Sequence, residues 1–148
     1  MRIYLDVCCL SRPFDDQSQV RIRFETEAIT LVLRLVAGGH HEWGSSEVID
    51  DEVRRSPRED SRAWILDLLR QAGGRISVTR ECVEFARGLV AHGLRAMDAL
   101  HVAAAETGGC DILLTTDDAL IRKAQTVRPP LRVRVLNPVR WLAEGRQL

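Results

Sequence analysis

Short apolar runs alternate along the chain with longer segments of helical periodicity, and this alternation limits the fold more than any other feature. The first run, 3–5, stops at Asp6, and the clearest late run is DILLT at 111–115. Apolar, partly β-branched runs of this length are typical of strands buried on both faces of a sheet. The predicted strands cover residues 3–5, 42–46, 76–78, 111–115 and 133–136.

Helices are predicted between these strands from apolar residues spaced three or four positions apart. The glycine pairs at 38–39 and 73–74 and the proline at 57 mark three helix ends. The predicted helices cover residues 22–36, 47–55, 63–69, 81–90 and 97–106, with one more starting near Asp117 and a last one carrying Trp141 and Leu142; residues 11–17 (SRPFDDQ) are a predicted loop. This order predicts a three-layer α/β/α domain with a central parallel sheet. Without a repeat or linker, residues 1–148 form a single domain.

The composition limits the classes of function. Twenty-one Lys and Arg residues balance twenty-one Asp and Glu residues, so any nucleic acid must be bound by a local patch and not by net charge. Cys8, Cys9, Cys82 and Cys110 lack metal-ligand spacing, which argues against a structural zinc site. The charge of Asp6 interrupts the first apolar run, so we expect no signal peptide, no membrane segment and a cytoplasmic location.

Two acidic residues follow predicted strands. Asp6 comes directly after the strand 3–5, and Asp117 lies two residues past the run 111–115. Because ligands bind beyond the carboxyl ends of the strands in an open parallel sheet, both side chains are expected at the same edge. The alternative for Asp6 is a carboxylate that serves only a turn or a helix cap.

The predicted helix 47–55 carries several acids, and helical geometry distinguishes one of them. At about 100° per residue, Val48, Ile49 and Val53 define an apolar face, and Glu52 falls within it. The acids expected to point toward water are Glu47, Asp50 and Asp51. A carboxylate on an inward face is costly to bury unless it meets a cation or hydrogen-bond donors. Glu52 is therefore the site candidate of this helix.

The helix MDALHVAAAE at 97–106 places Asp98 in its first turn, where an acid can cap backbone N–H groups. Asp117 has a similar alternative, because Thr115-x-x-Asp118 can be read as a capping box. Convergence of the acids at one sheet edge favours a site instead. Clustered carboxylates repel one another and require protons or a metal. Ligands that offer only oxygen suit Mg²⁺ or Mn²⁺ better than zinc.

Four features together resemble the PIN domain, and in particular its bacterial VapC-like group. They are IYLDVCC at the start, the inward Glu52, MDALHVAAAE and LLTTDD, and the resemblance extends from residue 3 to about residue 137. It implies a PIN-like α/β/α fold over a single domain and a metal-dependent ribonuclease, often the toxin of a type II toxin–antitoxin pair. The residues that match the family's catalytic and metal-binding acids are Asp6, Glu52, Asp98 and Asp117, with Thr115 as the threonine of the T-x-D motif.

The resemblance also implies a cofactor and partners. The four acids would hold Mg²⁺ or Mn²⁺, which binds a phosphodiester oxygen, activates a water and stabilises the charge of in-line attack on RNA. The implied protein partners are a cognate antitoxin and a second copy of the chain. Phosphate binding needs positive charge near the acids. The cations that flank the acids in sequence are Arg12, Arg54, Arg55, Arg95, Arg122 and Lys123, although ordinary surface arginines explain them equally well.

Four positions depart from the family pattern or stay open. Many members carry Asn or Ser two residues after the first Asp, whereas this chain has Cys8, a poor hydrogen-bonding substitute that would weaken the metal site. Asp15 and Asp16 are either additional ligands or acids that precede the helix at 22–36. His101, one turn past Asp98, either faces the site or packs within the domain.

Other classes of protein also gather acids at strand ends. A response-regulator receiver needs a phosphorylatable Asp after a middle strand, which is missing here, and haloacid-dehalogenase chemistry needs Asp-x-Asp after the first strand, where this chain has Val7-Cys8. A third alternative is a PIN-like scaffold, weakened at Cys8, that binds RNA or a protein without cleaving RNA. The presence of all four acids argues against such a loss of catalysis.

Overall fold

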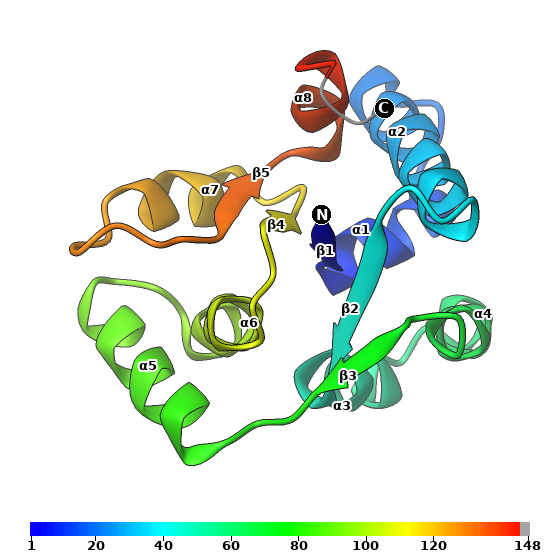
Figure 1. The fold of residues 1–148 in the computed structure, drawn as a ribbon. Helices are drawn as coiled ribbons and strands as arrows, with labels where there is room; N and C mark the ends of the chain where they lie inside the picture. The colour runs from blue at the N-terminus through cyan, green and yellow to red at the C-terminus, as the bar shows by residue number, and fades with distance from the viewer. Residues whose placement is uncertain (146–148) are drawn as a thin grey trace.

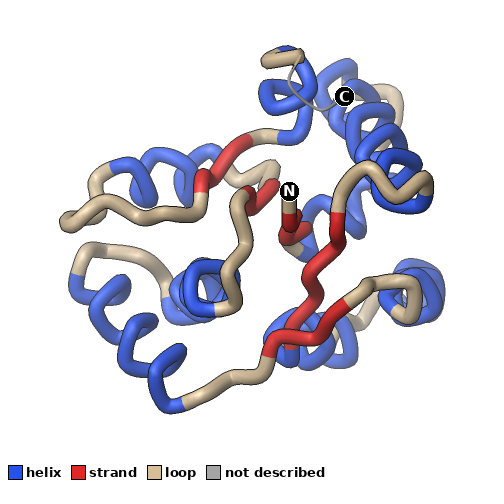
Figure 2. The backbone as a smooth tube through the Cα atoms, in the orientation of Figure 1, coloured by secondary structure: helices blue, strands red, loops and turns tan. Residues whose placement is uncertain are grey.

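The computed structural model describes residues 1–145. A five-stranded sheet lies at its centre, with helices on both sides (Figures 1 and 2). The strands are β1 (Arg2–Leu5), β2 (Glu42–Ser46), β3 (Gly74–Ile76), β4 (Ile112–Leu114) and β5 (Arg134–Leu136). The helices are α1 (Val7–Ser11), the 3₁₀ turn η1 (Arg12–Phe14), α2 (Val20–Ala37), α3 (Glu47–Arg55), α4 (Glu59–Leu69), α5 (Arg80–Ala91), α6 (Ala96–Thr107), α7 (Asp118–Gln125) and α8 (Pro138–Ala143).

All the strand pairs are parallel, and the order across the sheet is β3-β2-β1-β4-β5. The chain therefore moves outward from β1 in one direction to β3 and then crosses back to β4 and β5. Right-handed crossovers require these two halves to place their helices on opposite faces. Figure 1 shows this arrangement, with α5, α6 and α7 on one side of the sheet and α1, α2 and α4 on the other. The prediction of a three-layer α/β/α fold with a parallel sheet is confirmed.

The two central strands are buried on both faces. Ile3, Tyr4 and Leu5 of β1 are all 0% exposed, and each pairs in register with one residue of the equally apolar β4. Strands covered by helices on both sides are stabilised by apolar residues at every position. These two strands are therefore continuous apolar runs, without the alternation of apolar and polar residues seen in half-exposed strands. The alanines of α6 lie in the same core and let this helix pack closely.

Most predicted elements agree with the structure to within a few residues, and the strand at 42–46 and the helix at 47–55 match in full. Three differ. The predicted loop 11–17 is wrong in its first half, because Ser11 ends α1 and residues 12–14 form η1. The helix predicted at 63–69 starts at Glu59, four residues earlier, and the strand predicted at 76–78 lies at Gly74–Ile76.

No helix in the described part of the chain is both long enough and apolar enough to cross a membrane.

Candidate metal centre

The carboxyl ends of β1 and β4 lie side by side at the point where the strand order reverses. Leu5 pairs with Leu114, and the amide of the next residue, Asp6, donates to the Leu114 carbonyl over 3.0 Å. Connections leave these two strands toward opposite faces, and in open parallel sheets ligands bind at such a point. The residues that follow the two strands, Asp6 on one and Thr115 to Asp117 on the other, therefore meet at this edge.

Asp6 is a buried carboxylate fixed by donors on both oxygens. Its Oδ1 accepts from the Val7 amide over 2.8 Å, which caps α1, and its Oδ2 accepts from the Thr115 hydroxyl over 2.9 Å. The side chain is only 9% exposed. Capping, the alternative considered for Asp6, is thus real, but it occupies only Oδ1.

Glu52 lies where helical geometry placed it. Val48, Ile49 and Val53 form the buried face of α3, and the Glu52 side chain lies at the margin of this face with 35% exposure. The other acids of the helix point elsewhere and have separate partners: Glu47 accepts from the Val78 amide, Asp50 pairs with Arg75 and Asp51 pairs with Arg55. Glu52 is therefore the one acid of α3 that turns toward Asp6.

A histidine completes this group. Among the described residues, ligand atoms of Asp6, Glu52 and His101 all lie within 4.8 Å of one another. The His101 Nε2 is 2.7 Å from Oε2 of Glu52 and 3.8 Å from Oδ1 of Asp6. Burial lowers the pKa of His101, but the hydrogen bond to Glu52 and the negative charge of Asp6 outweigh it, so the pKa is raised above 6.5. Both suggestions for His101 hold at once: it is buried in the domain and it faces the site.

Asp98 lies outside that tight group but is electrostatically coupled to it. Its pKa is raised above the usual value by burial first and then by the negative charges of Asp6 and Asp117, while His101 and Arg95 partly oppose the shift. The N-cap of α6 is Arg95, so Asp98 occupies the first turn without being the cap residue. Repulsion by the neighbouring carboxylates therefore adds to the effect of burial at Asp98.

Asp117 is the N-cap of α7. Its Oδ1 accepts from the amides of Ala119 and Leu120 over 2.9 and 3.2 Å. The capping alternative is thus correct for this residue, but the predicted capping box is wrong, because the Asp118 carboxylate binds Arg21 instead. Both capping amides contact Oδ1, so Asp117 caps the helix with one oxygen only.

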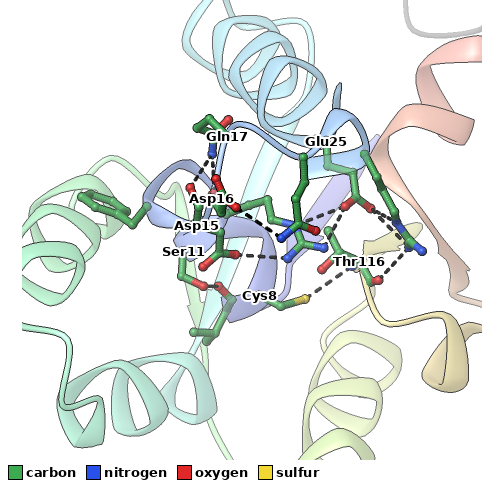
Figure 3. Close-up of polar contacts among 12 residues, drawn as sticks. Cys8, Ser11, Asp15, Asp16, Gln17, Glu25 and Thr116 are labelled. Carbon is green, nitrogen blue, oxygen red and sulfur yellow. Dashed lines mark hydrogen bonds and ion pairs between the residues drawn. The ribbon is translucent and has the colours of Figure 1, made fainter. Parts of the chain in front are cut away.

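Cys8 lies between the two halves of the site. Its Sγ is 3.4 Å from Oδ2 of Asp6 and 3.3 Å from Oγ1 of Thr115. It is also 3.4 Å from the Thr116 amide, a contact drawn in Figure 3. These contacts are long and weak, as expected for sulfur. Cys8 therefore occupies the position of a polar residue that orients the site, but its thiol is a poorer hydrogen-bond donor.

A network of ion pairs and hydrogen bonds around Glu25 supports the same edge of the sheet and was not predicted from the sequence. The Glu25 side chain is 2% exposed and accepts from Arg12 at 2.8 Å, from Arg21 and from Asn137 (Figure 3). Arg21 continues to Asp118 and to the Thr116 carbonyl. The network joins α2 to the loop before α7. An acid inside the apolar pattern of α2 was the available signal, as it was for Glu52.

The arginines expected to bind phosphate differ in how close they lie to the acids and in whether they already have ion-pair partners. Arg12 is held by Glu25 and Asp15, and Arg54 is directed about 200° around α3 from Glu52, into a pocket with Leu66 and Arg75. Arg55 pairs with Asp51 at the exposed surface. Arg95 is exposed and near enough to Asp98 to lower its pKa. Arg95 is thus the best placed of the four.

Asp15 and Asp16 are not part of the carboxylate cluster. Asp15 bridges Arg12 and Arg58, and Asp16 accepts from the amide and hydroxyl of Ser18 in the turn before α2 (Figure 3 labels both acids). Their interpretation as acids preceding a helix agrees with these contacts.

The residues present fit a hard divalent cation. The cluster offers carboxylate oxygens, and the negative charges of Asp6 and Asp117 add to burial in raising the pKa of Asp98. Mg²⁺ and Mn²⁺ prefer such oxygen ligands.

The chain is thus a doubly wound parallel α/β domain with carboxylates at its switch point, the edge where proteins of this class bind their ligands. The model of the PIN domain matches residues 3–125, so the chain belongs to the PIN domain family. The fold is also similar to a chain in the crystal structure of VapBC2 from Rickettsia felis bound to a DNA fragment from their promoter. That similarity covers 91% of this chain and 98% of the other, with a TM-score of 0.59 and 17% identity. None of the curated proteins compared with the chain matches it.

Proposed function

We propose that the protein is an endoribonuclease that hydrolyses RNA phosphodiester bonds with Mg²⁺ or Mn²⁺, and that it acts as a VapC-like toxin. One observation carries the proposal. The buried Asp6 lies close to Glu52, and the negative charges of Asp6 and Asp117 add to burial in raising the pKa of Asp98, which supports a common site for the four acids. A protein that keeps like charges together in this way needs a cation to neutralise them.

In this proposal the metal ligands are Asp6, Glu52, Asp98 and Asp117. A bound Mg²⁺ or Mn²⁺ supplies Lewis-acid activation of the phosphate and of a water molecule. The chain's own contribution is to hold its carboxylates in place. Thr115 and the Val7 amide fix Asp6, and the first amides of α7 fix one oxygen of Asp117. These fixed oxygens lower the cost of assembling the site when substrate arrives.

RNA would approach along the exposed cations nearest the acids. Arg95 is the first candidate for a phosphate contact because it adjoins Asp98. Arg55 is the second, since its only described partner is the half-exposed Asp51. Arg12 and Arg54 are less suited, because the first is tied to Glu25 and the second turns away from Glu52. The substrate is therefore held through its backbone, with affinity that falls as salt rises.

The proposed partners are a cognate antitoxin, a second copy of the chain and cytoplasmic RNA. The structural similarity to a chain of VapBC2, solved on promoter DNA, supports the antitoxin. The homodimer is carried over from the family resemblance. If the chain is a toxin, its expression alone should arrest growth, whereas a variant with Asp6→Asn and Asp98→Asn should not.

The direct test is cleavage of a generic single-stranded RNA by the purified protein. We expect cleavage with Mg²⁺ or Mn²⁺, none with excess EDTA, and a loss of at least about 100-fold in the Asp6→Asn/Asp98→Asn variant. The matched control is Glu27→Gln/Asp67→Asn, which removes two charges from exposed side chains of α2 and α4. This control should cleave at the wild-type rate.

Two results would decide against the proposal. Cleavage that persists in EDTA, or in the Asp6→Asn/Asp98→Asn variant, would exclude a metal nuclease at these acids. RNA binding and Mn²⁺ binding without cleavage of any RNA would favour the scaffold weakened at Cys8.

A further inference from the structure

A chain of buried hydrogen bonds runs from the core to Glu52. Oγ of Ser46, the N-cap of α3, is 2.7 Å from the Tyr4 hydroxyl, which is 2.7 Å from Nδ1 of His101. Nε2 of the same imidazole is 2.7 Å from Oε2 of Glu52. The first three residues are essentially inaccessible to solvent, with Tyr4 and Ser46 at 0% and His101 at 1% exposure. Their positions are therefore fixed by packing.

The chemistry of these groups determines which atom donates in each of these hydrogen bonds. An ionised carboxylate can only accept, so the bond to Glu52 requires a proton on Nε2 of His101. This holds for both the neutral and the charged imidazole. In the neutral form Nδ1 is an acceptor, so Tyr4 donates to it and Ser46 donates to Tyr4. Burial raises the pKa of Tyr4 well above 10, which keeps its hydroxyl protonated for this role.

Glu52 needs such an anchor because its own helix does not hold it. The side chain is 35% exposed at the margin of α3, and a glutamate has several rotatable bonds with which to turn toward solvent. The imidazole, in contrast, approaches both acids, with Nε2 at 2.7 Å from Glu52 and 3.8 Å from Asp6. The Nε2–H group of His101 therefore holds the Glu52 carboxylate close to the fixed carboxylate of Asp6.

We infer that His101, oriented by Tyr4, is a positioning residue that holds the Glu52 carboxylate beside Asp6 for metal binding, and is not itself a metal ligand. The inference rests on the proposed function, because it assigns Glu52 to the metal. Groups that orient ligands in this way commonly change metal affinity by about 10- to 100-fold. The same arrangement explains why a histidine, and not an aliphatic residue, occupies the buried face of α6.

The test is Mn²⁺ affinity measured by calorimetry on the folded protein, without substrate. His101→Ala should raise the Mn²⁺ dissociation constant about 10- to 100-fold. His101→Gln, which keeps an N–H donor near the position of Nε2, should stay within about threefold of wild type. Tyr4→Phe removes only the hydroxyl that orients the ring and should weaken binding by an intermediate factor. The control is the exposed His40→Gln, in the turn before β2, which should bind as wild type.

A spectroscopic measurement separates positioning from ligation. Electron spin-echo modulation of Mn²⁺ bound to the wild-type protein should show no directly coordinated nitrogen. A directly coordinated nitrogen that disappears in His101→Gln would overturn the inference, as would wild-type affinity in folded His101→Ala or, should that variant not fold, in Tyr4→Phe. If the wild-type protein binds no Mn²⁺ at all, the proposed function itself is contradicted and the inference with it.

Discussion

The hydroxyl of Thr115 donates to Oδ2 of Asp6 over 2.9 Å, and Oγ1 of Thr115 also accepts from the Asp117 amide over 3.2 Å. One buried side chain therefore links the acid that follows β1 to the loop that follows β4. Because Thr115 is 0% exposed, the bond to Asp6 is shielded from water. The threonine of the T-x-D motif thus acts on the first acid and not only on its own loop.

Thr115→Val should weaken Mn²⁺ binding and RNA cleavage by about 10- to 100-fold, because it removes the donor that fixes Asp6 at nearly constant volume. Thr115→Ser keeps the hydroxyl and should retain most of both. Calorimetric titration and initial cleavage rates would measure the two effects. Equal affinities for the valine and serine variants would show that the hydrogen bond has no role in the site.

Cys8→Ser should tighten Mn²⁺ binding by about two- to fivefold, because a hydroxyl is a better donor to the Asp6 carboxylate than a thiol. Cys8→Ala should weaken binding, since it removes the contact altogether. The two variants change little else at this half-buried position. If serine and alanine gave the same dissociation constant, the sulfur contacts with Asp6 and Thr115 would be incidental.

The fold was largely predictable because its strongest signals are local. The apolar runs of β1 and β4, the helix at 47–55 and the glycine pair after α2 are each set by residues adjacent in sequence. The helix α1 was missed because it has only five residues and directly follows a strand, too short for a helical period to show. The Asp6 carboxylate caps the first turn of α1. From the sequence, this role could not be distinguished from that of a metal ligand at the end of a strand.

The site was predictable only in part. Glu52 could be identified from the face of its helix, and Asp6 from the end of its strand. The hydrogen bonds among Tyr4, His101 and Glu52 join residues that are 97 and 49 positions apart, so no local pattern could reveal them. In β1, moreover, Ile3, Tyr4 and Leu5 are all buried, so nothing in the sequence distinguishes Tyr4 as facing α6.

Asp98→Asn should raise the melting temperature of the metal-free protein at pH 7.5. The pKa of Asp98 is raised in the folded state by burial and by Asp6 and Asp117, so above that pKa its charge costs stability. The gain should shrink as the pH falls and Asp98 becomes protonated in both the folded and unfolded states. In saturating Mn²⁺ the wild-type protein should have the higher melting temperature, because the variant lacks a metal ligand.

Thermal denaturation from pH 4 to pH 8 would measure this effect, with Asp67→Asn as the control on an exposed side chain. Should Asp98→Asn be less stable than wild type without metal at every pH, Asp98 would be a structural acid and not a member of a repelling cluster.

Glu25→Gln should destabilise the protein by about 2–3 kcal/mol, because it leaves the Arg12 charge without its buried partner. The value is below that of a fully buried pair, since the Arg12 and Arg21 side chains are 20% and 54% exposed. Urea denaturation would measure the free energy of unfolding. The control, Glu27→Gln at an exposed position of the same helix, should change it by less than about 0.5 kcal/mol.

The most direct test of the central claim is anomalous diffraction from crystals grown with Mn²⁺. The four-acid account expects an anomalous peak at coordination distance, about 2.0–2.3 Å, from carboxylate oxygens of Asp6 and at least one of Glu52, Asp98 and Asp117. Crystals of the Asp6→Asn/Asp98→Asn variant should lose that peak. The account would be contradicted if the protein binds Mn²⁺ in solution but the anomalous density in the crystals lies elsewhere, with none beside the four acids.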